Sequence, residues 1–153
     1  MIIRIQTEDF NVSDIQRSLS KDRVDVGAIA SFIGLVRDLP GDPLKTMTLE
    51  HYPGMTEKAL ETIVTEAEGR WQIIDSAIIH RIGDLKPADQ IVMVMVLSAH
   101  RRDAFEACQF IMDYLKTRAP FWKKERGPAG VKWVSARDTD AARAARWSEQ
   151  HTP

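Results

Sequence analysis

The chain is poor in the features that mark several specialised classes of protein. Cys108 is the single cysteine in 153 residues, which excludes an intrachain disulfide and a cysteine-rich zinc site. The longest apolar run, Ile91–Leu97, is far shorter than the roughly 18 residues of a membrane-spanning helix. Lys and Arg total 21 against 22 Asp and Glu, so the net charge of -1 creates no general attraction for nucleic acid. We therefore expect a cytoplasmic protein without a membrane or nucleic-acid partner.

Two signatures of catalysis are also missing. The sequence has no GxxxxGK[ST] loop for nucleotide phosphates, so activation by ATP on this chain is not expected. No nucleophile, base and acid can be recognised together. Cys108 falls in the apolar stripe of a predicted helix, where we expect an unreactive core residue.

Hydrophobic patterning predicts one domain over residues 1–153, of the α+β class. Apolar stripes at helical spacing predict two long helices, over about 56–71 and 101–116, and Pro120 ends the second. The tail over about 138–153 is mostly polar; it is a weak helix candidate and can be mobile.

The strands are predicted to form a mostly antiparallel sheet. The run Ile91–Leu97 is apolar at every position, which indicates a strand covered on both faces. The short connection Gly83–Asp89 is read as a turn and favours antiparallel neighbours. Ser13 with Gln16 has the pattern of a capping box for a short helix. Further strands are expected over 1–6, 24–36, 46–52 and 73–82, with a hairpin of 121–125 and 131–135.

The first candidate site is the junction of a buried strand with a helix at Ser98–Arg102. The first N–H groups of a helix lack partners and attract anions, and His100 and Arg101 stand beside them. This arrangement can hold a phosphate. The alternative is that the arginines are solvated surface residues and His100 is a buried imidazole with its partners satisfied.

The second candidate is the segment Lys116–Arg126, in which cations surround Phe121 and Trp122. Aromatic rings can stack on a flat heterocycle while neighbouring cations hold its phosphate or carboxylate. The alternative is a helix C-terminus rich in cations followed by an amphipathic edge strand.

The third candidate is Arg37, which a hydrophobic strand ending in Leu35 and Val36 delivers into a Pro/Gly-rich loop. An arginine in that place can reach a ligand while the strand holds it in position. A strand that simply emerges into solvent accounts for the pattern equally well.

Helix geometry separates two of these candidates. Arg101 and Lys116 are 15 positions apart in one predicted helix, or about 22 Å at 1.5 Å per residue. They cannot both contact one small ligand from the same subunit. Either they serve different sites, or Lys116 of one subunit joins Arg101 of another; we take a pocket across a two-fold dimer as the hypothesis.

Taken in order, several segments resemble the catalytic (large) subunit of molybdopterin synthase. The resemblance runs from about residue 24 to about 137, and its most specific part is the run Lys-Thr-Arg-Ala-Pro-Phe-Trp-Lys that begins at Lys116. The segments that carry it are Gly34-Leu35-Val36-Arg37, Leu49-Glu50-His51-Tyr52-Pro53-Gly54-Met55, Ile79-His80-Arg81-Ile82-Gly83, Ser98-Ala99-His100-Arg101, Phe105-Glu106-Ala107 and Gln109 to Glu125.

The resemblance implies an α/β hammerhead-type fold and a homodimer at the centre of a heterotetramer. A small ubiquitin-like carrier would insert its C-terminal Gly-Gly thiocarboxylate into each large subunit. The substrate would be cyclic pyranopterin monophosphate (precursor Z) and the product molybdopterin, whose dithiolene receives two sulfurs. The implied activity is that of a sulfurtransferase of molybdenum cofactor biosynthesis, with no cofactor or metal of its own. The sequence ends without Gly-Gly, so we expect the large subunit rather than the carrier.

The resemblance also implies roles for individual residues. Lys116 corresponds to the family's essential lysine and Lys123 to a second catalytic lysine. The implied substrate-binding residues, which include both lysines, are Leu35, Val36, Arg37, His100, Arg101, Lys116, Lys123, Lys124, Glu125 and Arg137, the last reaching across the dimer.

The implied chemistry suits these residue types. When the thiocarboxylate attacks, charge develops on the departing phosphate oxygen, and fixed cations there stabilise the transition state. We expect Arg37, His100 and Arg101 to hold the phosphate. Lys116 would stabilise anionic intermediates or transfer a proton, and like charge from Lys123 and Arg118 would lower its pKa.

Two other functions compete with this interpretation. Lys116 could form a Schiff base with a carbonyl substrate, in aldolase- or lyase-type chemistry. The segment of cations and aromatics could instead bind nucleic acid, although the near-zero net charge argues against it. Neither accounts for the ordered set of segments.

Overall fold

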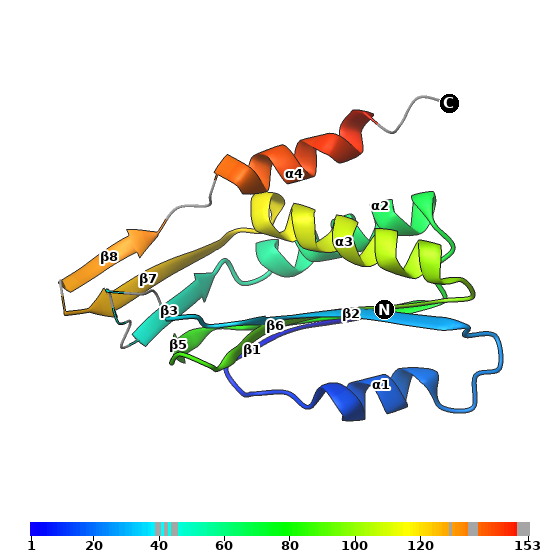
Figure 1. Ribbon diagram of the computed structural model, residues 1–153, viewed down its shortest axis with the longest axis horizontal. Coiled ribbons are helices and arrows are strands. Elements are labelled where there is room, and N and C mark those ends of the chain that lie inside the picture. Colours follow the sequence, from blue (N-terminus) through cyan, green and yellow to red (C-terminus); the bar gives the residue numbers. More distant parts are fainter. Residues whose placement is uncertain (39–40, 42, 44–45, 129, 135–137, 150–153) are drawn as a thin grey trace.

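The computed structural model describes residues 1–38, 41, 43, 46–128, 130–134 and 138–149. Within them, two four-stranded sheets carry helices on both faces of the first (Figure 1). The elements are β1 Ile2–Gln6, α1 Val12–Ser20, β2 Ala28–Leu35, β3 Thr46–His51, α2 Met55–Arg70, β4 Asp75–Arg81, β5 Gly83–Leu85, β6 Gln90–Ser98, α3 Arg101–Arg118, β7 Phe121–Gly127, β8 Gly130–Val134 and α4 Asp138–Glu149.

The first sheet has the strand order β1-β4-β6-β2 and is covered on both faces. Helix α1 lies on one face and helices α2 and α3 lie on the other (Figure 1). The two cores divide the side chains of β6 by alternation. Val92, Val94 and Val96 pack with α2 and α3, and Met93, Met95 and Leu97 pack on the side of α1. The prediction of a strand covered on both faces is confirmed.

The second sheet has the order β5-β3-β7-β8 and contains the predicted hairpin of β7 and β8. Strand β5 lies in the segment that the sequence predicted to be only a turn. It pairs with β3, and Leu85 lies opposite Met47, both of them buried. Three residues are too few to show a periodic pattern. Strands β1 and β4 pair in parallel, and every other pair of described strands is antiparallel. The predicted α+β class and mostly antiparallel sheets are therefore confirmed.

Helix α3 is a single helix from Arg101 to Arg118, and α4 lies across it (Figure 1). Trp147 anchors α4, because its ring makes edge contacts with Trp71 and Phe110 at 5.5 and 5.6 Å between centroids. The indole N–H donates a 2.7 Å hydrogen bond to the buried Asp113 carboxylate, which also accepts a bond from Arg146 at 3.1 Å. The weak helix candidate in the tail is therefore a packed helix.

The first helix begins two residues earlier than its capping pattern predicted. Asn11 is the N-cap, and its side chain accepts a 3.0 Å hydrogen bond from the backbone N–H of Asp14. Ser13 lies inside the first turn, so its predicted role as the cap is wrong. Asparagine caps a helix as well as serine does, and the sequence pattern alone could not choose between them.

No helix of the described residues is long and apolar enough to cross a lipid bilayer.

We predict that Asp113→Ala will lower the free energy of unfolding by about 1–3 kcal/mol, because the buried Trp147 N–H loses its acceptor. Chemical denaturation followed by tryptophan fluorescence measures the change. Glu68→Ala, an exposed acid on α2, is the control and should change it by less than about 0.5 kcal/mol. Equal effects of the two substitutions would show that the anchor contributes nothing to stability.

Candidate active site

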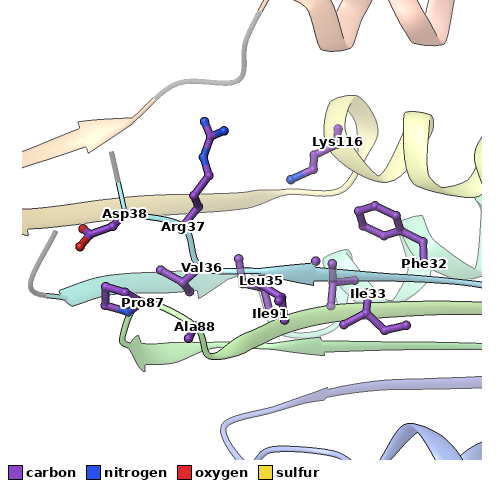
Figure 2. Close-up of a pocket in the computed structure, with 12 residues that line it drawn as sticks. Phe32, Ile33, Leu35, Val36, Arg37, Asp38, Pro87, Ala88, Ile91 and Lys116 are labelled. Carbon is purple, nitrogen blue, oxygen red and sulfur yellow. The ribbon is translucent and has the colours of Figure 1, made fainter. Parts of the chain in front are cut away.

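A groove of about 740 Å³ opens between the end of β2, the turn before β6 and the last turn of α3 (Figure 2). Its size is that of a small-molecule site. A small buried cluster of Val36, Met47, Leu49 and Leu85 joins its base to the second sheet. The lining residues are Phe32, Ile33, Gly34, Leu35, Val36, Arg37, Asp38, Pro87, Ala88, Ile91, Val92 and Lys116.

Two cations from distant parts of the sequence converge on this groove. Arg37 rises from the end of β2, and Lys116 extends toward it from the last turn of α3 (Figure 2). Leu35 and Val36 lie between them on the strand below. The structure thus brings together four of the predicted site residues, with apolar surface beneath their two charges.

Gly34 keeps the floor of the groove open. A Cβ at this position would lie 2.9 Å from Cγ1 of Val92 and 3.4 Å from the ring of Phe32. Any larger residue would displace one of these side chains or fill the space beside them. Steric crowding therefore explains why a glycine occupies position 34.

Backbone hydrogen bonds hold the wall opposite α3 against the end of β2. The Val36 N–H donates to Asp89 O at 2.9 Å, and the Ala88 N–H donates to Val36 O at 2.8 Å. Ala88 has a φ of 76°, a left-handed conformation that costs a residue with a Cβ about 1 kcal/mol or more. These bonds fix Arg37, which follows Val36 directly.

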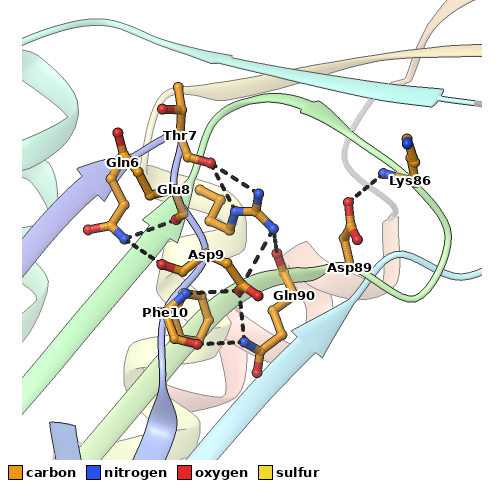
Figure 3. Close-up of polar contacts among 9 residues, drawn as sticks. Gln6, Thr7, Glu8, Asp9, Phe10, Lys86, Asp89 and Gln90 are labelled. Carbon is orange, nitrogen blue, oxygen red and sulfur yellow. Dashed lines mark hydrogen bonds and ion pairs between the residues drawn. The ribbon is translucent and has the colours of Figure 1, made fainter. Parts of the chain in front are cut away.

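A partly buried arginine, Arg81, ties the same wall to the segment that follows β1, in the network of polar contacts drawn in Figure 3. Arg81 donates two 3.1 Å hydrogen bonds to Thr7 O and one of 3.2 Å to Gln90 O. The Gln90 amide in turn donates to the Asp9 carboxylate at 2.9 Å and to Phe10 O at 2.8 Å. The hydrogen bond from Gln90, followed by that from the Phe10 N–H, lowers the pKa of Asp9. The start of β6 is thereby tied to the segment between β1 and α1.

Strand alternation separates the cations of β7. Lys123 and Glu125 share the face of Phe121, and their charged groups lie 3.9 Å apart. Lys124 is on the opposite face, where its ammonium lies 5.2 Å from the centroid of the Trp133 ring. The predicted group of Lys123, Lys124 and Glu125 is therefore divided between the two faces of the sheet.

The remaining predicted site residues lie elsewhere. His100 and Arg101 are exposed at the first turn of α3, at the opposite end of the helix from Lys116. Because the helix is unbroken, the predicted separation of about 22 Å applies. Arg137 falls outside the described residues.

Arg118 does not direct its charge toward the groove. Its guanidinium makes a bidentate ion pair with Glu66 of α2, at 2.9 and 3.0 Å, and lies 3.9 Å above the Tyr114 ring. A nearby carboxylate offsets much of its field. Arg118 is therefore a weaker source of like charge for Lys116 than the sequence suggested.

Comparison with known proteins decides the family. The family model described as MoaE protein matches residues 5–118. The chain is 56% identical over 146 residues to the molybdopterin synthase catalytic subunit of Ralstonia nicotianae, covering 95% of this chain and 83% of that one. The chain belongs to the MoaE family.

Solved structures agree with this family and its fold. A MoaE protein from Burkholderia ambifaria matches with a TM-score of 0.83 and 56% identity, over 96% of this chain and 97% of that one. A chain from the complex of subunits 1 and 2 of the Helicobacter pylori molybdopterin-converting factor matches with a TM-score of 0.72, over 90% and 92% of the two chains. At 16% identity the second shows the fold alone.

The MoaE fold also brings two histidines toward Lys116 that the sequence did not single out as site residues. His80 of β4 is buried and stacks on Phe121, with ring centroids 3.8 Å apart and planes at 14°. His51 of β3 lies opposite Phe121 in the sheet register, and its Nε2 is 3.3 Å from Glu57. Both histidines belong to segments that carry the family resemblance, which was the available signal.

The electrostatics of His80 differ from those of an ordinary histidine. Burial, opposed by the hydrogen bond to Arg81 O and assisted by the charges of Lys116 and His51, lowers its pKa to about 4. The imidazole is therefore neutral at neutral pH. Lys116 must lie close enough for its charge to act on this ring.

The lone cysteine is unsuited to chemistry in this MoaE chain. Cys108 is buried, with its Sγ 3.7 Å from Val94 O, and burial raises the pKa of its thiol to about 12. The expectation of an unreactive core cysteine is confirmed. Over the described residues, no three His, Cys, Asp or Glu side chains form a cluster able to hold a metal ion.

Because the pKa of His80 is depressed, we predict that the free energy of unfolding decreases as the pH is lowered from about 6.5 to about 4. In that window the unfolded chain binds a proton that the native imidazole refuses, at a cost of up to roughly 3 kcal/mol. His80→Phe, which keeps a stacked ring, should lose most of this dependence when urea denaturation is compared at pH 7 and pH 4.5. Ile78→Val, on the same strand, should lower stability equally at both values. An unchanged pH dependence in His80→Phe would contradict the assignment.

Proposed function

We propose that this chain is the catalytic subunit of molybdopterin synthase. It transfers sulfur from the C-terminal thiocarboxylate of a small ubiquitin-like carrier to cyclic pyranopterin monophosphate (precursor Z), and so forms the dithiolene of molybdopterin. The observation that carries the proposal is the groove in which Lys116 and Arg37 converge, in a chain that is 56% identical to a curated catalytic subunit. The cytoplasmic location expected from the sequence stays a prediction.

The groove has the chemistry that this substrate needs. A pterin is flat and largely apolar on its faces, and Leu35, Val36 and Phe32 offer it apolar surface. Its cyclic phosphate is anionic, and Arg37 presents a guanidinium that can bind two phosphate oxygens at once. When the thiocarboxylate sulfur displaces the phosphate oxygen from carbon, negative charge grows on that oxygen. A cation fixed beside it stabilises the transition state more than the bound substrate.

Lys116 is the residue that we assign to the reacting centre. Its ammonium can stabilise the developing anion or transfer a proton, and the groove places it across from Arg37. Lys123 is the second catalytic candidate. It shares a face of the second sheet with Phe121, whose strand follows α3 directly, and Glu125 lies beside it. Lys124, turned to the other face, is the weakest of the proposed substrate contacts.

A separate sulfur carrier removes the need for a nucleophile on this chain. The thiol of Cys108 is buried and held protonated, so it cannot serve as an acceptor of sulfur. A thiocarboxylate arrives already activated and needs only a site that binds it next to its target. The Helicobacter pylori protein with the same fold was solved as a complex of two subunits, which supports a small partner here.

We also propose that a second copy of this chain completes the site. Among the described strands β2 pairs only with β6, so its other edge presents unpaired backbone groups, flanked by the exposed side chains of Ile29, Phe32 and Leu35. An exposed apolar strand edge is a template on which another chain can pair. A two-fold axis lets β2 pair antiparallel with itself, which makes the interface self-complementary.

Such pairing would unite the two ends of α3. The first residue of β2, Ala28, lies opposite Ser98, close to His100 and Arg101, whereas the last residues of β2 line the groove of Lys116. Antiparallel pairing of β2 with the partner's β2 sets the beginning of one strand beside the end of the other. His100 and Arg101 of the partner subunit would then approach Arg37 and complete the phosphate site. The heterotetramer would consist of this dimer with one carrier on each copy, and Arg137 stays a predicted contact across it.

We predict that Lys116→Ala will reduce molybdopterin formation by about 10²-fold or more, since charge stabilisation at a reacting centre contributes that much. Purified protein is mixed with thiocarboxylated carrier and precursor Z, and product is measured as a fluorescent pterin derivative. Lys21→Ala, directly after α1 on the other side of the sheet, is the matched control and should keep full activity.

Two results would overturn the function. The wild-type protein could fail to form product with carrier and substrate that a known synthase accepts. Alternatively, borohydride could trap a carbonyl compound on Lys116 in the absence of carrier, which would establish Schiff-base chemistry instead.

A further inference from the structure

We propose that His80 is a positioning residue for Lys116, and that its Nε2 accepts a hydrogen bond from the lysine ammonium and holds it over the groove. The role rests on the proposed function of Lys116, but the contact itself can be tested without the reaction. Four observations carry it: the place of His80 in the sheet, the stack with Phe121, the tautomer of the ring and its neutrality.

The sheet register places His80 next to the floor of the groove. His80 lies opposite Val92 in the pairing of β4 with β6, and residues opposite each other project to the same face. Val92 and Lys116 both line the groove. His80 is therefore one strand away from the groove, on the face that α3 covers, with the last turn of α3 close by.

The stack fixes the imidazole plane. His80 and Phe121 are nearly parallel, with ring centroids 3.8 Å apart. Phe121 is itself held in place, because Thr56 of α2 is fully buried and donates a 3.0 Å hydrogen bond to the carbonyl of Pro120. Phe121 follows the last turn of α3 by a few residues, so its stack on His80 anchors the end of the helix that carries Lys116.

The tautomer follows from one contact. His80 Nδ1 lies 2.7 Å from the carbonyl oxygen of Arg81, and a carbonyl can only accept. The proton of a neutral ring must therefore be on Nδ1, which leaves Nε2 as a bare acceptor. Since the Arg81 side chain is held by Thr7 and Gln90, this contact is anchored to the network behind the groove.

Neutrality lets the ring act as an acceptor beside cations. Burial lowers the pKa of His80 to about 4, and the charges of Lys116 and His51 assist, so the ring stays unprotonated over the range in which an enzyme of this kind works. A protonated ring would repel Lys116 instead of binding it. The charged or titratable groups around the stack are Lys116 of α3, His51 of β3, its partner Glu57 of α2, and Lys123 and Glu125 of β7.

The test compares two amide substitutions that differ in reach. His80→Asn keeps a donor for Arg81 O but ends short of Nε2, whereas His80→Gln can extend an acceptor to that position. Selective isotope labelling and NMR follow the titration of Lys116 in each full-length protein, with precursor Z and carrier absent. In His80→Asn we expect its midpoint to fall by about one pH unit, because an acceptor favours the charged amine. His80→Gln should stay near the wild-type midpoint.

Enzyme kinetics provide a second test of the contact. His80→Asn should lower kcat about tenfold with little change in the KM for precursor Z, and shift the alkaline limb of the pH profile downward. His80→Gln should recover most of the rate. Ile78→Val, buried on the same face of β4, controls for a general loss of packing and should change neither the lysine titration nor the pH profile.

An unchanged Lys116 titration in His80→Asn would overturn the proposal, as would equal defects in the Asn and Gln variants. If His80→Asn does not fold, His80→Phe keeps the stack, lacks the acceptor and gives the same test. If the wild-type protein makes no molybdopterin but the titration of Lys116 still shifts in His80→Asn, the contact is supported and the proposed function is refuted, so the two failures are distinguishable.

Discussion

The packing of the buried face of α3 determines the distance between the cations at its two ends. Cys108, Ile111 and Leu115 are buried in the core that α3 shares with the sheet, and Phe110 and Asp113 on the same helix hold Trp147 of α4. A helix fixed along its length cannot bend to bring its two ends together. The cations at its first turn and at its last turn are therefore kept about 22 Å apart within one subunit, and a site that needs both must use two copies. The proposed dimer follows from this constraint together with the position of β2 at the edge of its sheet.

The second sheet and the stack of His80 on Phe121 determine which charges surround Lys116. Alternation along β7 brings Lys123 and Glu125 to one face and leaves Lys124 on the other. A cation and a carboxylate on the same face limit the excess of positive charge. Behind Lys116 the neutral His80 adds an acceptor rather than a further cation, and its ring is fixed by Phe121 and the Arg81 carbonyl. The substrate's anionic phosphate is thus the proposed complement of Arg37 and Lys116.

The amino-acid sequence predicted most of the fold because its patterns are long. Seven consecutive apolar residues identify β6, and an apolar stripe at helical spacing runs along the eighteen residues of α3. The three residues of β5 show no such pattern, and the choice of Asn11 over Ser13 as a cap depends on local geometry. For the site, Arg37 and Lys116 were predicted and do converge. The split of Lys123 from Lys124, the pairing of Arg118 with Glu66 and the stack of His80 on Phe121 depend on tertiary contacts, which no local pattern encodes.

The central claim is that one site takes Lys116 from one copy and Arg101 from the other, and subunit mixing tests it most directly. Lys116→Ala and Arg101→Ala chains, each inactive alone, are unfolded and refolded together in equal amounts. Half of the dimers are then mixed, and each mixed dimer has one site with both wild-type residues, so activity should return to about a quarter of the wild-type level. If both residues belonged to one subunit, every site would carry a substitution. Activity no greater than the sum of the two separate variants would contradict the account.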